Sequence, residues 1–136
     1  MMHPEATRRL GHALQAIAAI QRYTANAPFQ ESLSDDLTRS AVQRQLGIVQ
    51  EALRLALVEE PSLRQTWLDV DALLAGCARM RDWENEVPLA DRVGFVGGDL
   101  KVWQGRLVEG LRQQQEEGAK LDQQIAEDLR RLGYEF

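Results

Sequence analysis

The chain has 136 residues, with 16 basic and 21 acidic side chains, and its formal charge at pH 7 is −5. This length corresponds to one ordinary domain, which can bury a core without disulfides or a structural metal. Neither half of the chain is strongly basic, so the sequence does not predict the nonspecific nucleic-acid binding of a basic arm. The single cysteine, Cys77, excludes an intrachain disulfide and a cysteine zinc site.

Hydropathy along the chain indicates a soluble protein. The longest apolar runs are far shorter than a membrane span, and no secretory hydrophobic region follows the N-terminus. We therefore expect a protein of the reducing cytoplasm, with no membrane partner, no cofactor and no metal ion.

The first predicted helix covers about residues 5–26, where apolar side chains fall on one stripe. These are Leu10, Leu14, Ile17 and Ile20. Capping and first-turn residues follow Pro28, and they are Ser32, Ser34, Asp35 and Asp36.

The second predicted helix covers about residues 36–58 and has the clearest buried stripe in the chain. Its positions are Val42, Leu46, Val49, Leu53 and Leu57, and the stripe is widened by Ile48, Ala52 and Leu55. We expect this helix to be central.

A third helix is predicted to start near Trp67 or Asp69, after Pro61 and Ser62. Its apolar face consists of Trp67, Val70, Leu74, Cys77 and Met80. Both Trp67 and Trp103 are expected in the core, whereas Trp83 lies beside charged residues and suits an exposed or interface position.

Residues 85–98 are predicted to form a loop, because Pro88 disfavours helix and three glycines loosen the backbone. Asp99 is placed to cap a fourth helix, whose inward face consists of Leu100, Trp103, Leu107 and Leu111. The segment 116–118 weakens that helix, and a second apolar stripe follows at Leu121, Ile125, Leu129 and Leu132.

These elements predict one all-α domain over residues 1–136, an antiparallel four- to five-helix bundle. Residues 113–136 form its C-terminal helical extension.

Three blocks of sequence carry a family resemblance. In chain order they read TRSAVQRQLGIVQEA at 38–52, ARMRD at 78–82 and GDLKVW at 98–103. Over about residues 8–112 the chain resembles the HepT-like branch of the HEPN (higher eukaryote and prokaryote nucleotide-binding) proteins. Members of that branch are typically ribonuclease toxins paired with a nucleotidyltransferase antitoxin. The resemblance implies a homodimer whose two motifs face each other.

The signature of that family is an arginine and an asparagine, then a histidine five positions after the arginine and a tyrosine two further on. The equivalent positions here are Arg81, Asp82, Glu86 and Pro88. In the family reaction an RNA 2′-hydroxyl attacks its own phosphate, which needs proton transfer and a cation to stabilise the developing charge. Arginine suits the phosphate, and histidine suits the proton transfer.

The departures from the signature weaken this chemistry. Asp82 adds a negative charge, and the Glu86 carboxylate repels phosphate and donates no proton unless its pKa is raised. Pro88 has no hydroxyl to accept the AMP that antitoxins of the family transfer to the tyrosine. Of the two histidines, His12 could join Arg81 only if the fold happened to bring them together.

A simpler interpretation of Arg81 is an exposed, salt-bridged helix end shared with Asp82, Glu84 and Glu86. In a dimer, Arg81 is predicted to pair with Glu84 or Glu86 of the other copy, so that Arg81→Glu weakens the dimer. Cys77 is expected to be a buried, inert thiol.

Three functional hypotheses follow. The first is a non-catalytic or weakly active HepT-like protein that binds a nucleotidyltransferase partner, RNA or both. The second is an active, metal-independent endoribonuclease toxin that uses Arg81 and Glu86. The third is a plain helical scaffold or interaction protein, because a fold does not determine a function.

Overall fold

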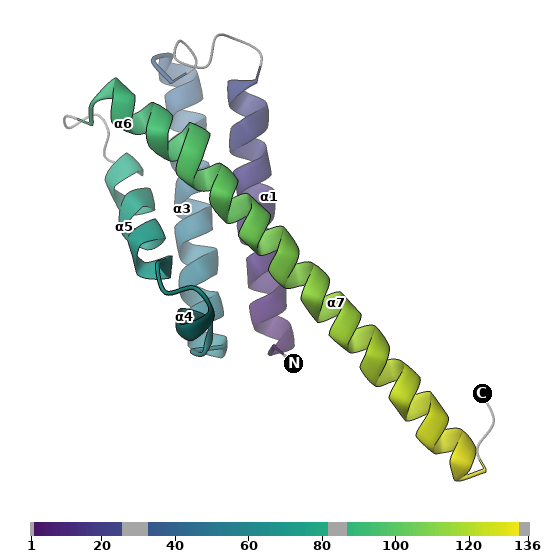
Figure 1. Ribbon diagram of the computed structural model, residues 1–136. Coiled ribbons are helices and arrows are strands. Elements are labelled where there is room, and N and C mark those ends of the chain that lie inside the picture. Colours follow the sequence, from purple (N-terminus) through teal and green to yellow (C-terminus); the bar gives the residue numbers. More distant parts are fainter. Residues whose placement is uncertain (1, 26–32, 82–86, 134–136) are drawn as a thin grey trace.

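The computed structural model describes residues 2–25, 33–81 and 87–133, and every regular element in them is helical. The elements are α1 (Pro4–Thr24), α3 (Asp36–Glu59), α4 (Leu63–Thr66), α5 (Val70–Arg81), α6 (Leu89–Gly94), the π-helical turn η1 (Phe95–Asp99) and α7 (Leu100–Arg131) (Figure 1). The predicted all-α class and helical bundle are confirmed. Among these described helices, none has the length and apolar character needed to cross a membrane.

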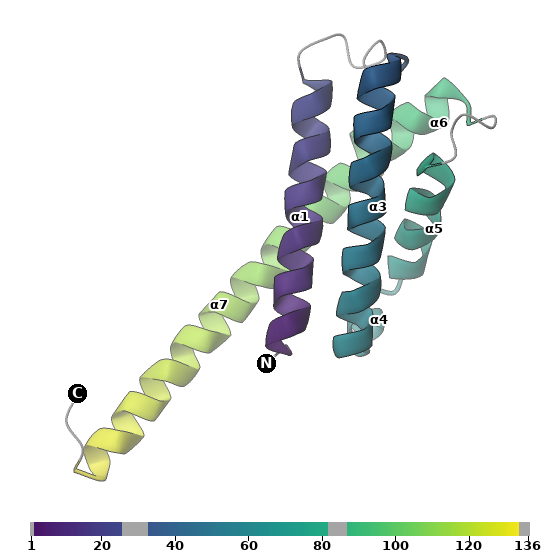
Figure 2. The ribbon, with the colours of Figure 1, turned by 180° about the vertical axis from the view of Figure 1, so that it is seen from behind.

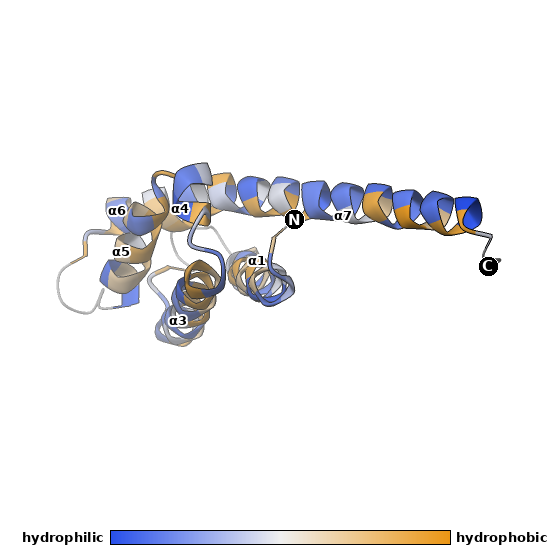
Figure 3. Ribbon diagram, turned by 90° about the horizontal axis from the view of Figure 1, so that it is seen from below, coloured by the Kyte–Doolittle hydropathy of each residue, from blue (hydrophilic) through white to orange (hydrophobic). Residues whose placement is uncertain are grey.

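The helices form two layers. α1, α3 and α5 lie side by side, each antiparallel to the next, and α7 crosses this layer obliquely (Figures 1 and 3). α3 contacts both α1 and α5, so it is the central helix, as predicted. The C-terminal half of α7 extends past the start of α1, away from the other helices (Figures 1 and 2).

The stripe on α3 explains its central place. All five predicted positions are buried, and none exposes more than 4% of its surface; they are Val42, Leu46, Val49, Leu53 and Leu57. The helix begins where Asp35 caps it: the carboxylate accepts hydrogen bonds from the Thr38 N–H and hydroxyl, both at 2.9 Å. These bonds hold the pKa of Asp35 below its ordinary value. The predicted widening of the stripe is wrong at Ile48, which is 39% exposed.

The predicted loop at 85–98 is wrong over most of its length. α6 begins immediately after Pro88, which occupies the N-cap position, where its missing N–H leaves no helical hydrogen bond unmade. The π-helical turn then leads directly into α7. Val87, Phe95 and Val96 are buried in the core, and this packing outweighs the low helix propensity of the glycines.

Two other expectations at α7 need correction. Asp99 belongs to η1 and makes no capping hydrogen bond, because the backbone before α7 is already helical. The segment 116–118 does not interrupt the helix, which runs unbroken to Arg131. The predicted C-terminal helical extension is confirmed as far as that residue.

The third predicted helix corresponds to α5, which starts at Val70, slightly after the predicted start. The short helix α4 before it was not predicted. Trp103 is buried, as expected, whereas Trp67 is half-buried and packs edge-on against Trp103 with ring centroids 5.6 Å apart. Arg106 lies over the Trp103 ring and pairs with Asp69 at 2.6 Å, which ties α7 to the start of α5. Trp83 lies outside the described residues.

Gly76 of α5 allows a close approach of η1. A Cβ at this position would lie 2.3 Å from Cε2 of Phe95, whereas one at Gly105 in α7 would meet nothing within 4 Å. We expect Gly76→Ala to destabilise the fold by about 1–3 kcal/mol through overpacking. Gly105→Ala should stabilise it by roughly 0.5–1 kcal/mol through helix propensity. Urea denaturation of both variants measures the difference, and equal stabilities would contradict the close packing of Phe95 on α5.

Candidate functional site

Side chains from three helices surround a shallow hollow of about 420 Å³ on the α1–α3–α5 layer. Its charged or titratable lining consists of Arg9 and His12 from α1, Arg44 and Glu51 from α3, and Arg81 from α5. We call this set the cationic hollow. Its remaining lining is small or apolar: Gly47, Ile48, Ala52 and Leu55.

The cationic hollow faces away from α7. None of its lining residues belongs to α7, and Figure 2 shows α1, α3 and α5 in front of that helix. α1 meets α7 through other positions, such as Gln21, which donates a hydrogen bond to Gln104 at 2.7 Å. With 3.6 residues per turn, His12 lies roughly 180° around α1 from Gln21. The hollow is therefore on the face of the layer that α7 leaves open.

Arg81 is held across α3. Its guanidinium donates a hydrogen bond to Oε1 of Gln50 at 3.0 Å, and its carbonyl accepts one from Gln43 at 2.9 Å. Gly47 lies beneath it, and a Cβ there would be 3.6 Å from the Arg81 Nε. These contacts orient the cation toward the hollow. Its predicted pairing with Asp82, Glu84 or Glu86 concerns residues outside the described ranges.

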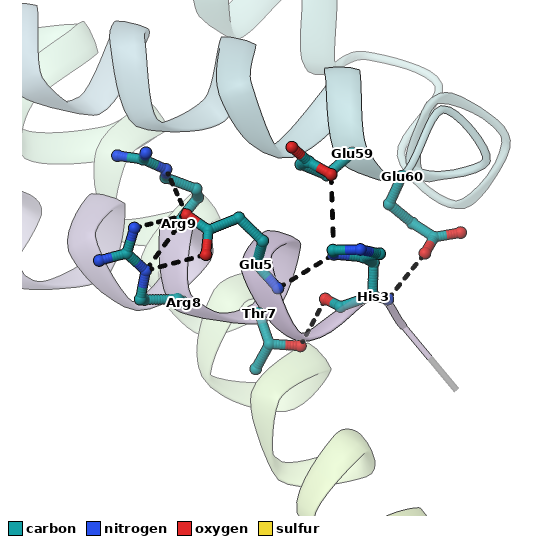
Figure 4. A network of polar contacts seen from close by, with 7 residues as sticks. All are labelled: His3, Glu5, Thr7, Arg8, Arg9, Glu59 and Glu60. Atoms are coloured by element: carbon teal, nitrogen blue, oxygen red, sulfur yellow. Dashed lines mark hydrogen bonds and ion pairs between the residues drawn. The ribbon is translucent and has the colours of Figure 1, made fainter.

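Arg9 is shared with a polar network at the start of α1 (Figure 4). Its Nε lies 3.3 Å from the Glu5 carboxylate, which Arg8 also contacts. The hydrogen bond from Arg8 holds the pKa of Glu5 below its ordinary value, so this carboxylate stays charged at neutral pH. Arg9 therefore contributes only part of its charge to the hollow.

Glu51, the one carboxylate among the described residues that line the hollow, is already engaged. Arg54 donates two hydrogen bonds to it, at 2.6 and 3.0 Å. These bonds lower the pKa of Glu51, and the nearby charge of Arg9 lowers it further. Within the described part of the chain, Arg44 and His12 form no side-chain hydrogen bond or ion pair. An anion entering the hollow would thus meet cations whose charge is not fully neutralised.

Arginine forks and an imidazole are suited to bind phosphate oxygens, and the imidazole can also carry a proton. The sequence identified Arg81 as a candidate site residue but gave no reason to place His12 beside it. In the structure both residues line the same hollow. Arg9 and Arg44 were not predicted. Arg44 does share a helical face with Ile48, Glu51 and Leu55, so an exposed flank of the second predicted helix was the available signal.

Two of the three motif-equivalent residues, Asp82 and Glu86, lie outside the described residues. Pro88 is exposed at the start of α6, where it has a structural role. No group of three or more metal-binding side chains occurs in residues 2–25, 33–81 and 87–133.

A second hollow, of about 560 Å³, lies between α5, α6, η1 and the first turn of α7. Its charged groups are largely paired with each other or with neighbours: Arg79 contacts Asp91 at 2.8 Å, and Asp69 is held by Arg106. Charge already neutralised within the protein attracts an ionic ligand weakly. The cationic hollow is therefore the better candidate site.

Comparison with known proteins identifies no relative: no family model, no curated protein and no solved structure matches the chain.

Cys77 is buried against the core, as predicted, and this burial raises the pKa of its thiol to about 12. Because the thiolate is the reactive form, we expect iodoacetamide to modify native Cys77 at least about a hundredfold more slowly than the urea-unfolded chain at pH 8. Mass spectrometry of timed samples measures both rates. Similar rates in the two states would contradict the buried position.

Proposed function

We propose that this chain is a non-catalytic, HepT-like helical protein that binds single-stranded RNA through backbone phosphates. The observation that carries the proposal is the convergence of Arg9, His12, Arg44 and Arg81 from three helices on one open hollow. The family resemblance adds the class of ligand, since HepT-like proteins act on RNA.

The charge balance favours a weak, salt-dependent interaction with few phosphates. The whole chain carries a formal charge of −5, so attraction is confined to the hollow. If Arg44 and Arg81 each neutralise about one phosphate and Arg9 neutralises part of one, the logarithm of the binding constant should fall with the logarithm of salt concentration with a slope of about −2. A basic protein that coats nucleic acid would show a much steeper dependence.

Binding is better supported than cleavage, because cleavage needs both a base and an acid. His12 could perform one of these roles. Glu51 is a poor proton donor, because Arg54 holds its pKa below the ordinary value and keeps it ionised. The hollow thus offers cations for phosphate but lacks a matched pair of proton-transfer groups among the described residues.

We expect Arg81→Ala and Arg44→Ala each to weaken RNA binding about tenfold, the loss typical of a charged hydrogen bond. Arg79→Ala is the matched control, since Arg79 is on the same helix but pairs with Asp91 at the other hollow. Fluorescence anisotropy with a labelled single-stranded oligonucleotide measures all three. If Arg79→Ala costs as much as Arg81→Ala, the cationic hollow is not the binding site, and the plain-scaffold hypothesis gains support.

An RNA cleavage assay with chelator present tests the non-catalytic part of the proposal. We expect intact RNA with the wild-type protein. Cleavage that is lost in both His12→Ala and Arg81→Ala would instead identify a metal-independent endoribonuclease. Cleavage that persists in Arg81→Ala would indicate a contaminating nuclease or another site.

The nucleotidyltransferase partner and a dimer across Arg81 rest on the family resemblance alone and stay predictions. Co-purification with a nucleotidyltransferase encoded beside this chain tests the first, and sedimentation of Arg81→Glu tests the second.

A further inference from the structure

The C-terminal half of α7 presents an apolar stripe that this chain does not cover. In α7 the buried side chains end at Leu107, and the helix continues to Arg131 away from the other helices (Figure 1). Leu111 still packs against the core, but apolar residues recur beyond it along the projecting part, at Leu121, Ile125, Leu129 and Leu132. On this projecting part, Leu121, Ile125 and Leu132 are 47%, 48% and 73% exposed.

This stripe continues the core-facing side of the same helix. At 100° per residue, Leu111 and the four apolar positions of the projecting part all lie within about 40° of Leu107 around the helix axis. Gln114 and Gly118 fill the same line between Leu111 and Leu121. Figure 3 shows the hydrophobic colour running along one side of the projecting half. The positions step by three and four residues, which is the spacing of a helix that pairs with another helix.

We propose that residues 114–132, the C-terminal part of α7 and its C-cap residue, pair in antiparallel orientation with the same segment of a second copy of this chain. The proposed surface is separate from the cationic hollow and does not depend on the proposed function. It also differs from a dimer across Arg81.

The antiparallel register follows from the stripe. Placing Leu121 beside the partner's Ile125 sets Gly118 opposite the partner's Asp128 and Gln114 opposite the partner's Leu132. Asp128, which lies at the edge of the stripe, then meets the smallest residue available. A parallel pair in register would instead set Asp128 beside the partner's Asp128 and Gly118 beside the partner's Gly118, which opposes like charges and leaves a gap.

Charge complementarity selects the same orientation. Glu117 and Arg131 lie on one flank of the stripe, each seven residues from Gln124. In an antiparallel pair Glu117 therefore faces the partner's Arg131, twice by symmetry, with the two Gln124 side chains between them. A parallel pair would set Glu117 beside the partner's Asp122. The cost of the antiparallel register is on the other flank, where Asp122 faces the partner's Asp122.

A groove at the base of the projecting helix receives the end of the partner helix. It has a volume of about 680 Å³ and lies between α1 and α7, where it is lined mainly by Met2, Pro4, Leu14, Val108 and Leu111. The proposed register brings the partner's Leu132 to Gln114, which also lines this groove. The exposed end of one stripe thus meets an apolar surface of the other copy.

Sedimentation equilibrium over a concentration series tests the pairing. The wild-type protein is expected to show a dimer of the 15.4 kDa chain, and the double variant Leu121→Glu/Ile125→Glu a monomer. The matched control is Leu37→Glu/Leu68→Glu, which alters two residues that are 83% and 87% exposed outside the stripe and should leave the dimer unchanged. A monomeric wild type, or a dimer that persists in the stripe variant, would overturn the proposal.

Single charge reversals test the orientation. Glu117→Arg should raise the dimer dissociation constant about tenfold, because it opposes the partner's Arg131 at two symmetric positions. Adding Arg131→Glu should restore it, and Asp122→Asn should tighten the dimer. A parallel pair predicts the opposite sign for Glu117→Arg, since that change would relieve repulsion with the partner's Asp122. Tighter association of Glu117→Arg would therefore reject the antiparallel register.

Discussion

The packing of α3 between α1 and α5 is the constraint on which the candidate site depends. Buried leucines and valines on α3 fix the spacing of the two outer helices. The hollow forms on the outer face of this three-helix layer, where side chains of α1, α3 and α5 meet. Arg9, Arg44 and Arg81 are far apart in sequence and share no local motif. They converge only because the packed core fixes how the three helices lie against one another. No charged side chain among the described residues is buried in that core.

Features that depend on residues close together in the sequence could be predicted, whereas features that depend on contacts between distant segments could not. The stripe from Val42 to Leu57, a helix cap within residues 32–36 and the buried Cys77 follow from local spacing, and all three are confirmed, with Asp35 as the cap. Residues 89–98 are helical although their composition predicted a loop. Burial of Phe95 and Val96 in the core stabilises this segment more than the low helix propensity of its glycines destabilises it. The hollow could not be predicted, because its position depends on how α1 packs on α3, and residue spacing within a single helix does not determine that packing.

The charge distribution reconciles an acidic chain with an anion site. Carboxylates near the hollow are already bound by arginines on their own helix, as Glu5 is by Arg8 and Glu51 by Arg54. The cations that remain belong to different helices and face a surface that α7 does not cover. α7 in turn crosses the opposite face of the layer and carries its apolar side beyond it, so the two proposed surfaces occupy separate parts of the molecule. A dimer formed through α7 would therefore leave the cationic hollow of each copy accessible.

The most direct test of the binding site is a ¹H–¹⁵N NMR titration of the full-length protein with a short single-stranded RNA. We expect the largest shifts at the backbone amides of Arg9, His12, Arg44, Gly47 and Arg81, and we expect these shifts to diminish as the salt concentration is raised. Shifts centred on Asp69, Arg79 and Asp91, or no shifts at low salt, would contradict the proposed binding site.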